Sequence, residues 1–229
     1  PPGFVSADGL QWQQRSVTFN CPGPRPKWVD FHSVVYDAQA PASRRWKAYG
    51  CMCPNEPPVR RTVCYAYSGD GQTWTQHPEN PILQPETSSS WDKVHDVGVT
   101  IYKGHYVMIY QAGDGYDQHL ELAVSRDGEH FVRVHDGQAI IAQGMGDAFD
   151  RGLHLPTRPL LLEDEIRLYY GAADYLAPDD PPFEFERWKM CKLQMGLATL
   201  PTDGWTYLRN IKGKHVGYIT SVPMAVEDL

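Results

Sequence analysis

Short runs of apolar, β-branched and aromatic residues follow one another along the chain, each ending at glycine, proline or polar residues. Examples of these runs are TVCYAYS, HYVMIYQAG and EIRLYYGAA. Such runs are typical of β-strands that are separated by turns. No segment combines a helical period of apolar residues with the residues that cap a helix. The pattern therefore predicts an all-β protein.

One turn sequence, Ser-x-Asp-Gly followed by two residues and an aromatic one, occurs three times, at Ser6–Trp12, Ser68–Trp74 and Ser125–Phe131. Asp-Gly supplies the positive φ angles of a tight hairpin turn, so each copy predicts a hairpin tip, and we expect the tryptophans that follow the tips, Trp12, Trp74 and Trp205, in the core. The copies start 62 and 57 residues apart. A weaker fourth copy, Leu200–Leu208, follows a proline- and acid-rich insertion at 174–188. The spacing indicates a repeated unit.

Each unit opens with an aromatic residue and an aspartate, continues with three β-rich runs, and ends with the hairpin and a fourth strand. Four antiparallel strands in a unit of about 60 residues describe a blade of a β-propeller. A β-sandwich is the alternative, but it predicts hairpins without a recurring aspartate at the start of each unit. We predict a β-propeller of four-stranded antiparallel blades.

The repeat also predicts the organisation of the chain. Residues 1–218 form the propeller, with the last strands of one blade at 1–20 and further blades at 21–80, 81–140 and 141–210. Residues 219–229 start a further strand or a C-terminal β-sandwich. These blades do not close a ring, and open sheet edges invite association. We expect a partner chain, or a segment outside this sequence, to complete the propeller.

Composition narrows the range of partners. The net charge of −7 gives no support for a nucleic-acid or anionic-membrane partner. No apolar run approaches the roughly 20 residues that span a bilayer. An acidic chain with 12% aromatic residues suits a neutral, hydroxyl-rich ligand such as a sugar.

The compartment stays open. The first ten residues, PPGFVSADGL, lack the basic start and apolar stretch of a signal peptide. Because the first residue is not Met, a secreted or periplasmic location is compatible with residues upstream. The five cysteines form an odd set without zinc or redox spacing, so we expect reduced thiols.

Several segments resemble the five-bladed β-propeller glycosidase superfamily, which holds glycoside hydrolase families 32, 43, 62, 68 and 130. They are DFHSVVYD with RRWKAYG, WDKVHDVGVTIYKGHYVMIYQ, FDRG with RPLLLEDEIRLYYGAAD, and MGLATLPTDGW. The resemblance covers about residues 5–210 and is greatest to uncharacterised bacterial members. It implies a central funnel lined by the innermost strand of each blade, whose first residues face the pocket.

Cleavage of a glycosidic bond needs one carboxyl group that protonates the leaving oxygen and another that acts as base or nucleophile. Because the first residues of each innermost strand would face the funnel, Asp30 is the candidate base or nucleophile, with a turn-capping role as the alternative. Asp96, expected at the equivalent place in the second blade, would position or tune the acid, and Asp92 competes for that role. Families 32 and 43 use a glutamate as acid, whereas the third blade of this chain offers Asp150. The acid is therefore Asp150, lies outside this chain, or is absent.

Other residues near these aspartates are candidates for binding substrate: Trp28, His32, Trp91, Asp92, His95, Arg151, His154 and Arg158. The tryptophans would stack on a sugar ring, and the histidines would bond hydroxyl groups rather than a metal. The arginines suit an anionic group, or they pair with nearby aspartates. Of Tyr169 and Tyr170, which alternate along a strand, one packs while the other reaches the pocket.

The sequence thus predicts a glycoside hydrolase that acts on an oligo- or polysaccharide by carboxylate acid/base catalysis, without a cofactor. A non-catalytic carbohydrate-binding propeller is one alternative. A glycoside phosphorylase is another, in which Arg151, His154 and Arg158 would bind phosphate.

Overall fold

The computed structural model describes residues 2–23, 26, 28–53, 61–85, 93–113, 118–134, 138–152, 154–174 and 192–206. Across these ranges the chain consists of β-strands and one short 3₁₀ turn, Ala42–Arg44. The prediction of an all-β protein is confirmed. No helix in the described ranges has the length and apolar character that crossing a bilayer requires.

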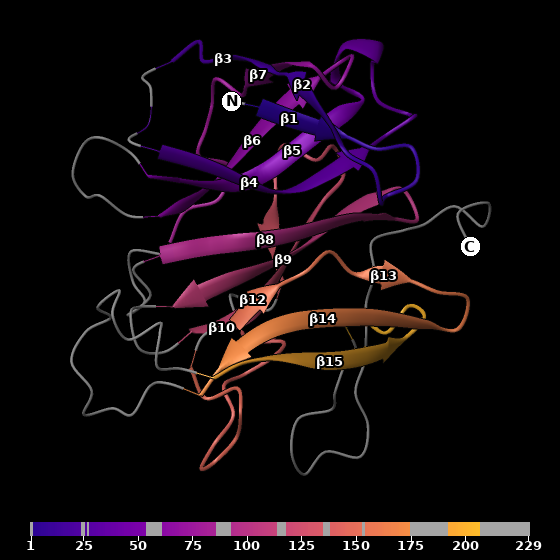
Figure 1. The fold of residues 1–229 in the computed structure, drawn as a ribbon. Helices are drawn as coiled ribbons and strands as arrows, with labels where there is room; N and C mark the ends of the chain where they lie inside the picture. The colour runs from indigo at the N-terminus through magenta and orange to yellow at the C-terminus, as the bar shows by residue number, and fades with distance from the viewer. Residues whose placement is uncertain are drawn as a thin grey trace, which may run out of the picture.

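Three sheets follow one another in chain order, as Figure 1 shows. The first blade pairs, in this order, β4 (Trp28–Tyr36), β5 (Trp46–Cys53), β6 (Thr62–Ser68) and β7 (Thr73–Gln76), and β3 (Thr18–Asn20) adds to β7 in parallel. The second blade pairs β8 (Lys93–Tyr102), β9 (His105–Gly113), β10 (Gln118–Ser125) and β11 (Val132–Arg133). In the third blade, β12 (His154–Pro156) and β13 (Leu160–Leu161) share one edge of β14 (Glu165–Ala173), and β15 (Leu193–Pro201) takes the other. The first two sheets contain the four antiparallel strands that the repeat predicts for a blade, whereas the third has three strand positions among the described residues.

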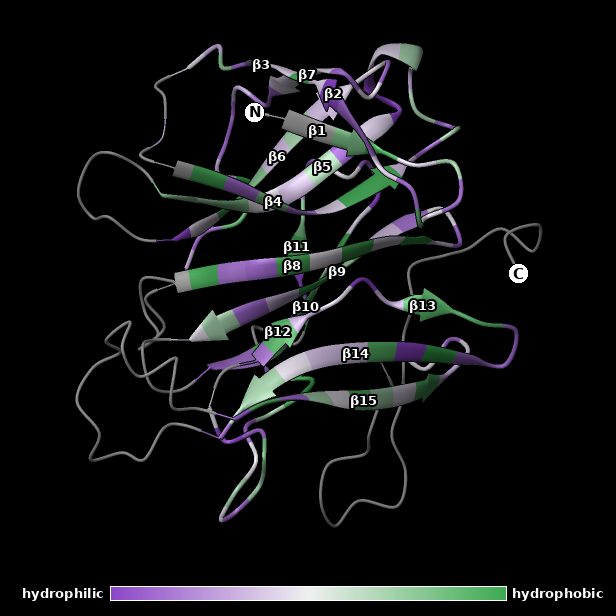
Figure 2. Cartoon of the chain, viewed as in Figure 1, coloured by the Kyte–Doolittle hydropathy of each residue, from purple (hydrophilic) through white to green (hydrophobic). Residues whose placement is uncertain are grey.

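The first strands of the three blades start on the same side of the molecule, at the left of Figure 1. Figure 2 shows hydrophilic residues in the N-terminal half of β4 and of β8, followed by more apolar residues. The polar openings of β4 and β8 are therefore brought to one side of the molecule. The segment 219–229, predicted to start a further strand or sandwich, lies outside the described residues.

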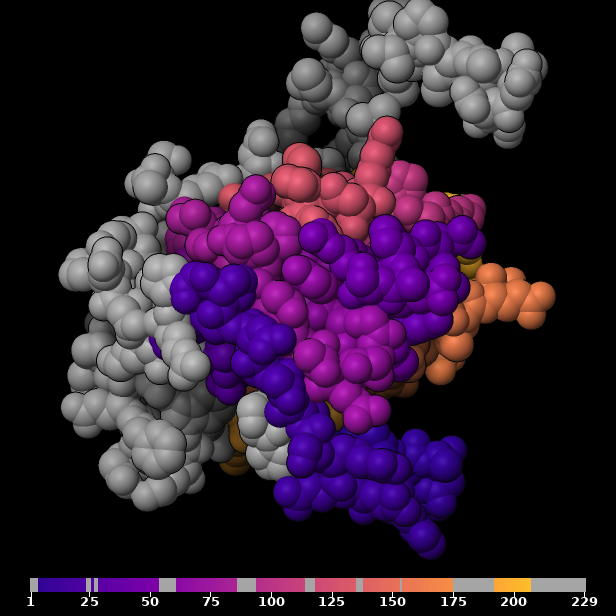
Figure 3. Space-filling view, turned by 90° about the horizontal axis from the view of Figure 1, so that it is seen from above, coloured from indigo at the N-terminus to yellow at the C-terminus, as the bar shows by residue number. Residues whose placement is uncertain are grey.

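A separate hairpin of β1 (Pro2–Val5) and β2 (Gln13–Ser16) projects from the body of the protein, as the indigo lobe in Figure 3 shows. Trp12, expected in the core because it follows a hairpin tip, is 60% exposed here. Trp74 follows the equivalent tip of the first blade and is buried. The difference arises because, among the described residues, the hairpin pairs with no larger sheet.

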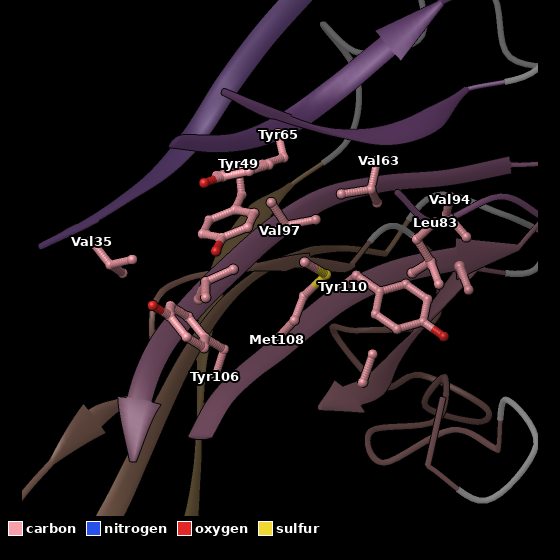
Figure 4. Close-up of a cluster of buried hydrophobic side chains, with 13 residues drawn as sticks. Val35, Tyr49, Val63, Tyr65, Leu83, Val94, Val97, Tyr106, Met108 and Tyr110 are labelled. Atoms are coloured by element: carbon pink, nitrogen blue, oxygen red, sulfur yellow. The ribbon is translucent and has the colours of Figure 1, made fainter. Parts of the chain in front are cut away.

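The second blade is buried on both faces, and its strand β9 shows this most clearly. Tyr106, Met108 and Tyr110 face the first blade, within the cluster drawn in Figure 4. Val107 and Ile109 alternate with them and pack against the third blade. Side chains alternate between the two faces of a strand, so a strand between two blades is apolar at nearly every position.

The Asp-Gly tips are closed by side-chain hydrogen bonds. Asp70 Oδ1 accepts bonds from the backbone N–H groups of residues 72 (2.8 Å) and 73 (2.7 Å), and Ser68 Oγ accepts one from Gly71 N–H (2.9 Å). Gly71 has a φ of +72°, and the copies at Ser6–Trp12 and Ser125–Phe131 repeat these bonds. The repeated sequence is thus a local structural device.

The fourth copy differs from the other three. There Asp203 has the positive φ of +67°, and its carboxylate accepts hydrogen bonds from the side chains of Tyr102 and Lys103 in the second blade. In the first three copies glycine alone has the positive φ. The expectation that both residues of each Asp-Gly pair supply positive φ is therefore wrong.

We expect Met108→Ala and Ile109→Ala each to lower the free energy of unfolding by about 2–5 kcal/mol, because each removes a fully buried side chain on opposite faces of β9. Urea unfolding followed by tryptophan fluorescence measures the loss. Leu10→Ala is the control, since Leu10 is 84% exposed, and should change stability by less than about 0.5 kcal/mol. A loss confined to one face would contradict two-sided packing.

The tip carboxylates predict a dependence of stability on pH. Backbone hydrogen bonds from residues 73 and 72 hold the pKa of Asp70 below its ordinary value. The stabilisation is therefore complete above the unfolded pKa of about 4 and is lost as the pH falls through the folded pKa. We expect Asp70→Asn to lower the melting temperature at pH 7, and the difference from wild type to shrink below about pH 4. Exposed Asp164→Asn should show no such trend.

Candidate functional site

The first strands of the first and second blades each contain a β-bulge near the N-terminal end. The pairing of β4 with β5 shifts at His32, and the pairing of β8 with β9 shifts at Asp96. A bulge adds one unpaired residue and redirects its side chain. Gly50 lies beside the first bulge, where a Cβ atom would sit 1.8 Å from the carbonyl oxygen of Asp30. Only glycine permits that approach.

The bulges correct one sequence expectation, that Asp30 and Asp96 occupy equivalent places in their blades. The bulged residues are the equivalent pair, so His32 of the first blade corresponds to Asp96 of the second. Asp30 lies two residues before its bulge, where the second blade has the buried apolar residue Val94. The sequences around the two aspartates gave no sign of this offset.

The two bulges bring side chains of neighbouring blades into contact as a His–Asp–His cluster, composed of His32, His95 and Asp96. Asp96 Oδ1 lies 3.3 Å from His32 Nε2, and Asp96 Oδ2 lies 2.6 Å from His95 Nδ1. The shorter contact is a hydrogen bond, and because a carboxylate only accepts, His95 Nδ1 bears the proton. Within the part of the chain that the structure describes, no group of three His, Cys, Asp or Glu side chains has the geometry of a metal site.

Electrostatics fix the charges of this cluster. Burial by itself would raise the pKa of Asp96, but the hydrogen bond from His95 and the charges of both histidines and Arg61 outweigh it, and the pKa is lowered. Burial lowers the pKa of His32, although Asp96 opposes the change. At neutral pH, Asp96 is therefore an anion and His32 is neutral. Asp96 suits a fixed negative charge or an acceptor, and not a proton donor.

Asp30 lies beside the cluster on β4 and is exposed. Its charge acts on His32, whose pKa it raises in opposition to the larger effect of burial. The residue opposite Asp30 on β5, Cys51, is buried, and burial raises the pKa of its thiol. Cys51 is therefore a neutral wall residue, and Asp30 is the solvent-accessible carboxylate of this region.

The third blade brings together a second group, composed of Asp150, His154 and Tyr170. The Tyr170 hydroxyl donates to Asp150 Oδ2 at 3.0 Å, and His154 Nε2 lies 3.9 Å from the same oxygen. His154 opens β12 and is fully buried, whereas the Asp150 side chain is 15% exposed. Burial, followed by the bond to Asp150, raises the pKa of Tyr170 to about 12. Tyr170 is thus the tyrosine of its pair that reaches a candidate site residue.

A hydrogen bond from a side chain to the backbone links the His–Asp–His cluster to the group on the third blade. The Gln111 side chain donates to the backbone carbonyl of His154, and Gln111 pairs with His95 across β8 and β9. Asp96 and Asp150 themselves share no hydrogen bond or ion pair within the described residues. The structure therefore joins Asp96 to His32 and His95, and Asp150 to His154, as two neighbouring groups.

The remaining predicted residues lie around or beyond these groups. Arg151 Nη2 donates to the backbone carbonyl of Asp174 at 2.7 Å, and Arg158 is exposed in the gap between β12 and β13. Trp28 is in β4, but the structure does not describe its side chain. Trp91 and Asp92 lie outside the described residues. The substrate-binding roles expected of these five residues stay predictions.

Two residues near the site, Arg61 and His119, were missed from the sequence. Arg61 immediately precedes β6, and its charge lowers the pKa of Asp96; no local signal marked it. His119 is buried in β10 with Glu121, and His119 Nε2 lies 2.8 Å from Glu121 Oε1. Alternation in HLELAVS places these two residues on one face of the strand, and that pattern could have identified His119.

No protein-family model and no curated protein matches this sequence. Solved structures with a similar fold include a family 117 glycoside hydrolase from Zobellia galactanivorans, with a TM-score of 0.57, 17% identity, and coverage of 86% of this chain and 57% of that one. A fructofuranosidase from Schwanniomyces occidentalis gives a TM-score of 0.57, 15% identity, and coverage of 92% and 39%. An N-acetylgalactosamine deacetylase from F. plautii gives 0.52, 16%, and coverage of 74% and 49%.

The chain therefore shares the β-propeller fold of these solved structures. It spans between 39% and 57% of the length of these three structures. At such identities the likeness concerns the fold, and the chemistry of this chain depends on its own residues.

The cluster predicts a coupled titration. Because the Asp96 anion raises the pKa of His32 against the effect of burial, Asp96→Asn should lower the pKa of His32 further. NMR titration of the His32 ring protons measures this shift. Asp164→Asn, which changes an exposed aspartate on the β13–β14 turn, is the matched control and should leave His32 unchanged. An unchanged or higher pKa in Asp96→Asn would show that the two side chains do not interact in solution.

Proposed function

We propose that the protein is a glycosidase-like enzyme that cleaves a glycosidic bond by carboxylate acid/base catalysis at the N-terminal ends of the innermost strands. In this proposal Asp30 is the base or nucleophile, Asp96 is a fixed negative charge beside the reacting sugar, and Asp150 is the acid. His32 and His95 hold Asp96 in place and bond sugar hydroxyl groups.

One observation carries the proposal, namely the His–Asp–His cluster that the two bulges build between neighbouring blades. Glycoside cleavage passes through a transition state with positive charge on the sugar ring. A carboxylate that is fixed in place and kept anionic stabilises that charge without reorganising during the reaction. Asp96 meets both requirements, and the exposed Asp30 lies within electrostatic reach of the cluster.

The third blade supports the role given to Asp150. Its carboxyl group is partly exposed, and a tyrosine hydroxyl and a buried histidine lie against the same oxygen. A general acid needs such a position, because it must reach the leaving oxygen while neighbouring groups control its proton. Asp30 and Asp150 belong to different blades.

A neutral carbohydrate is the substrate class that fits best. The chain has a net charge of −7, and the Asp96 anion adds local repulsion against an acidic sugar. The fold is shared with a fructofuranosidase that was solved with fructose and with a deacetylase that was solved with the blood group B trisaccharide. These structures support a sugar ligand and do not select among sugars.

A non-catalytic carbohydrate-binding propeller is the second candidate. The observation that favours it is that both carboxylate oxygens of Asp96 are already engaged by histidines, an arrangement that also suits recognition of hydroxyl groups. A phosphorylase has less support, because the Arg151 guanidinium is engaged by a backbone carbonyl and Arg158 is on the surface.

Activity on a panel of sucrose, inulin and the blood group B trisaccharide tests the proposal, with and without inorganic phosphate. For a hydrolysed substrate we expect Asp30→Asn and Asp150→Asn to lower kcat by about 10²–10⁴-fold, since each removes a group that transfers a proton or attacks the sugar. Asp164→Asn is the matched control and should retain wild-type activity.

Binding of the same sugars by calorimetry separates the alternatives. Binding by wild type, Asp30→Asn and Asp150→Asn without hydrolysis by any of them would favour the binding propeller. Turnover only with phosphate present would favour the phosphorylase. Hydrolysis that both variants retain in full would overturn the assigned roles.

A further inference from the structure

The side chain of His154 contains a buried ring nitrogen that its hydrogen bonds do not explain. His154 is fully buried, and Nε2 has no hydrogen-bond partner among the described residues. The other ring nitrogen, Nδ1, lies 2.8 Å from the backbone carbonyl oxygen of Gln118. A buried polar atom without a partner has lost its hydrogen bonds to water without replacement, so its presence calls for a physical reason.

The bond to Gln118 fixes the tautomer of His154. A carbonyl oxygen only accepts, so Nδ1 bears the proton of the neutral ring and Nε2 presents a lone pair. The ionisable atom next to that lone pair is Asp150 Oδ2, at 3.9 Å. A lone pair facing an ionised carboxylate in a buried site is repulsive, whereas a proton held between them makes the contact attractive.

The other groups around the pair do not remove this requirement. Tyr170 donates its hydroxyl proton to Asp150 Oδ2, so it does not supply a proton to His154. His119 acts on His154 through its charge, but it pairs with Glu121. Arg151, next to Asp150 in the chain, donates to the carbonyl of Asp174.

We propose that Asp150 and His154 hold one proton between them at neutral pH, and that His154 is the positioning residue that retains this proton beside the third-blade carboxyl group. The catalytic use of the proton rests on the proposed function, but its existence does not. Burial lowers the pKa of His154 and so favours a neutral ring.

The proton balance of the cleavage step follows from this assignment. As the bond between the anomeric carbon and the leaving oxygen breaks, that oxygen takes the shared proton and Asp150 becomes an anion. A water molecule adds to the anomeric carbon, and the proton that it loses passes to a base. The base releases that proton to solvent, and solvent returns one proton to the Asp150–His154 pair, so the net reaction is addition of water.

Nitrogen-15 NMR of the imidazole rings in the full chain tests the shared proton directly. We expect Nε2 of His154 to be hydrogen-bonded or protonated near neutral pH, and to change in one titration step between about pH 5 and about pH 9. Asp150→Asn should abolish that step. An Nε2 signal that stays unprotonated, free of hydrogen bonds and unaffected by Asp150→Asn across the range would overturn the inference.

His154→Asn supplies a second test, because the asparagine amide can keep the donor to the Gln118 carbonyl while removing Nε2. Hydrolysis at pH 8 relative to pH 6 should fall about tenfold further in this variant than in wild type, because the shared proton then has no imidazole nitrogen to retain it. His105→Asn is the matched control, since His105 is exposed and its Nδ1 lies 3.1 Å from a backbone carbonyl. An identical pH profile in His154→Asn and wild type would contradict the positioning role.

The outcomes separate the inference from the proposed function. A shared proton seen by NMR in a protein that hydrolyses no sugar would support the inference and oppose the glycosidase proposal. Hydrolysis without the NMR signature would do the reverse. If His154→Asn fails to fold, as circular dichroism would show, the wild-type titration and its response to Asp150→Asn still decide the matter.

Discussion

Burial of the second blade on both faces is the constraint on which the rest of this structure depends. Alternate side chains of β9 pack against the first blade, at Met108, and against the third, at Ile109, and both are fully buried. A strand in that position cannot slip by one residue, because its two sets of side chains would exchange faces. The stacking therefore fixes how β4, β8 and β12 lie relative to one another, and with them every residue of the candidate site.

The two β-bulges bring polar side chains of the stacked first and second blades into contact. A regular β4 and a regular β8 would continue their alternation through His32 and Asp96, whereas the extra residue in each strand redirects one polar side chain. The result is a contact of 3.3 Å between neighbouring blades, within a cluster that keeps Asp96 anionic. At β12, burial of His154 places a ring nitrogen that has no hydrogen-bond partner among the described residues next to Asp150.

The repeated Asp-Gly hairpin tips also stabilise the stack, because they form hydrogen bonds between neighbouring blades. The tip of the second blade reaches the first, where the Tyr49 hydroxyl donates to the Gly128 carbonyl at 2.7 Å and Lys47 Nζ donates to the Asp127 carbonyl at 3.2 Å. The tip of the third blade reaches the second through Asp203. A sequence repeat that seems to describe only turns thus also joins consecutive blades.

The sequence by itself determined the strands, the hairpin tips and the aspartates near the openings of the blades, because alternation and turn conformation depend on residues close in the chain. Only the tertiary structure decided that Asp96 corresponds to His32 rather than to Asp30, since a bulge inserts one residue without a distinctive local pattern. It also decided that His154 is buried beside Asp150 while Trp12 is exposed. Distances between side chains of different blades depend on how sheets stack and in which register they pair, and a shift of one residue moves a side chain to the opposite face.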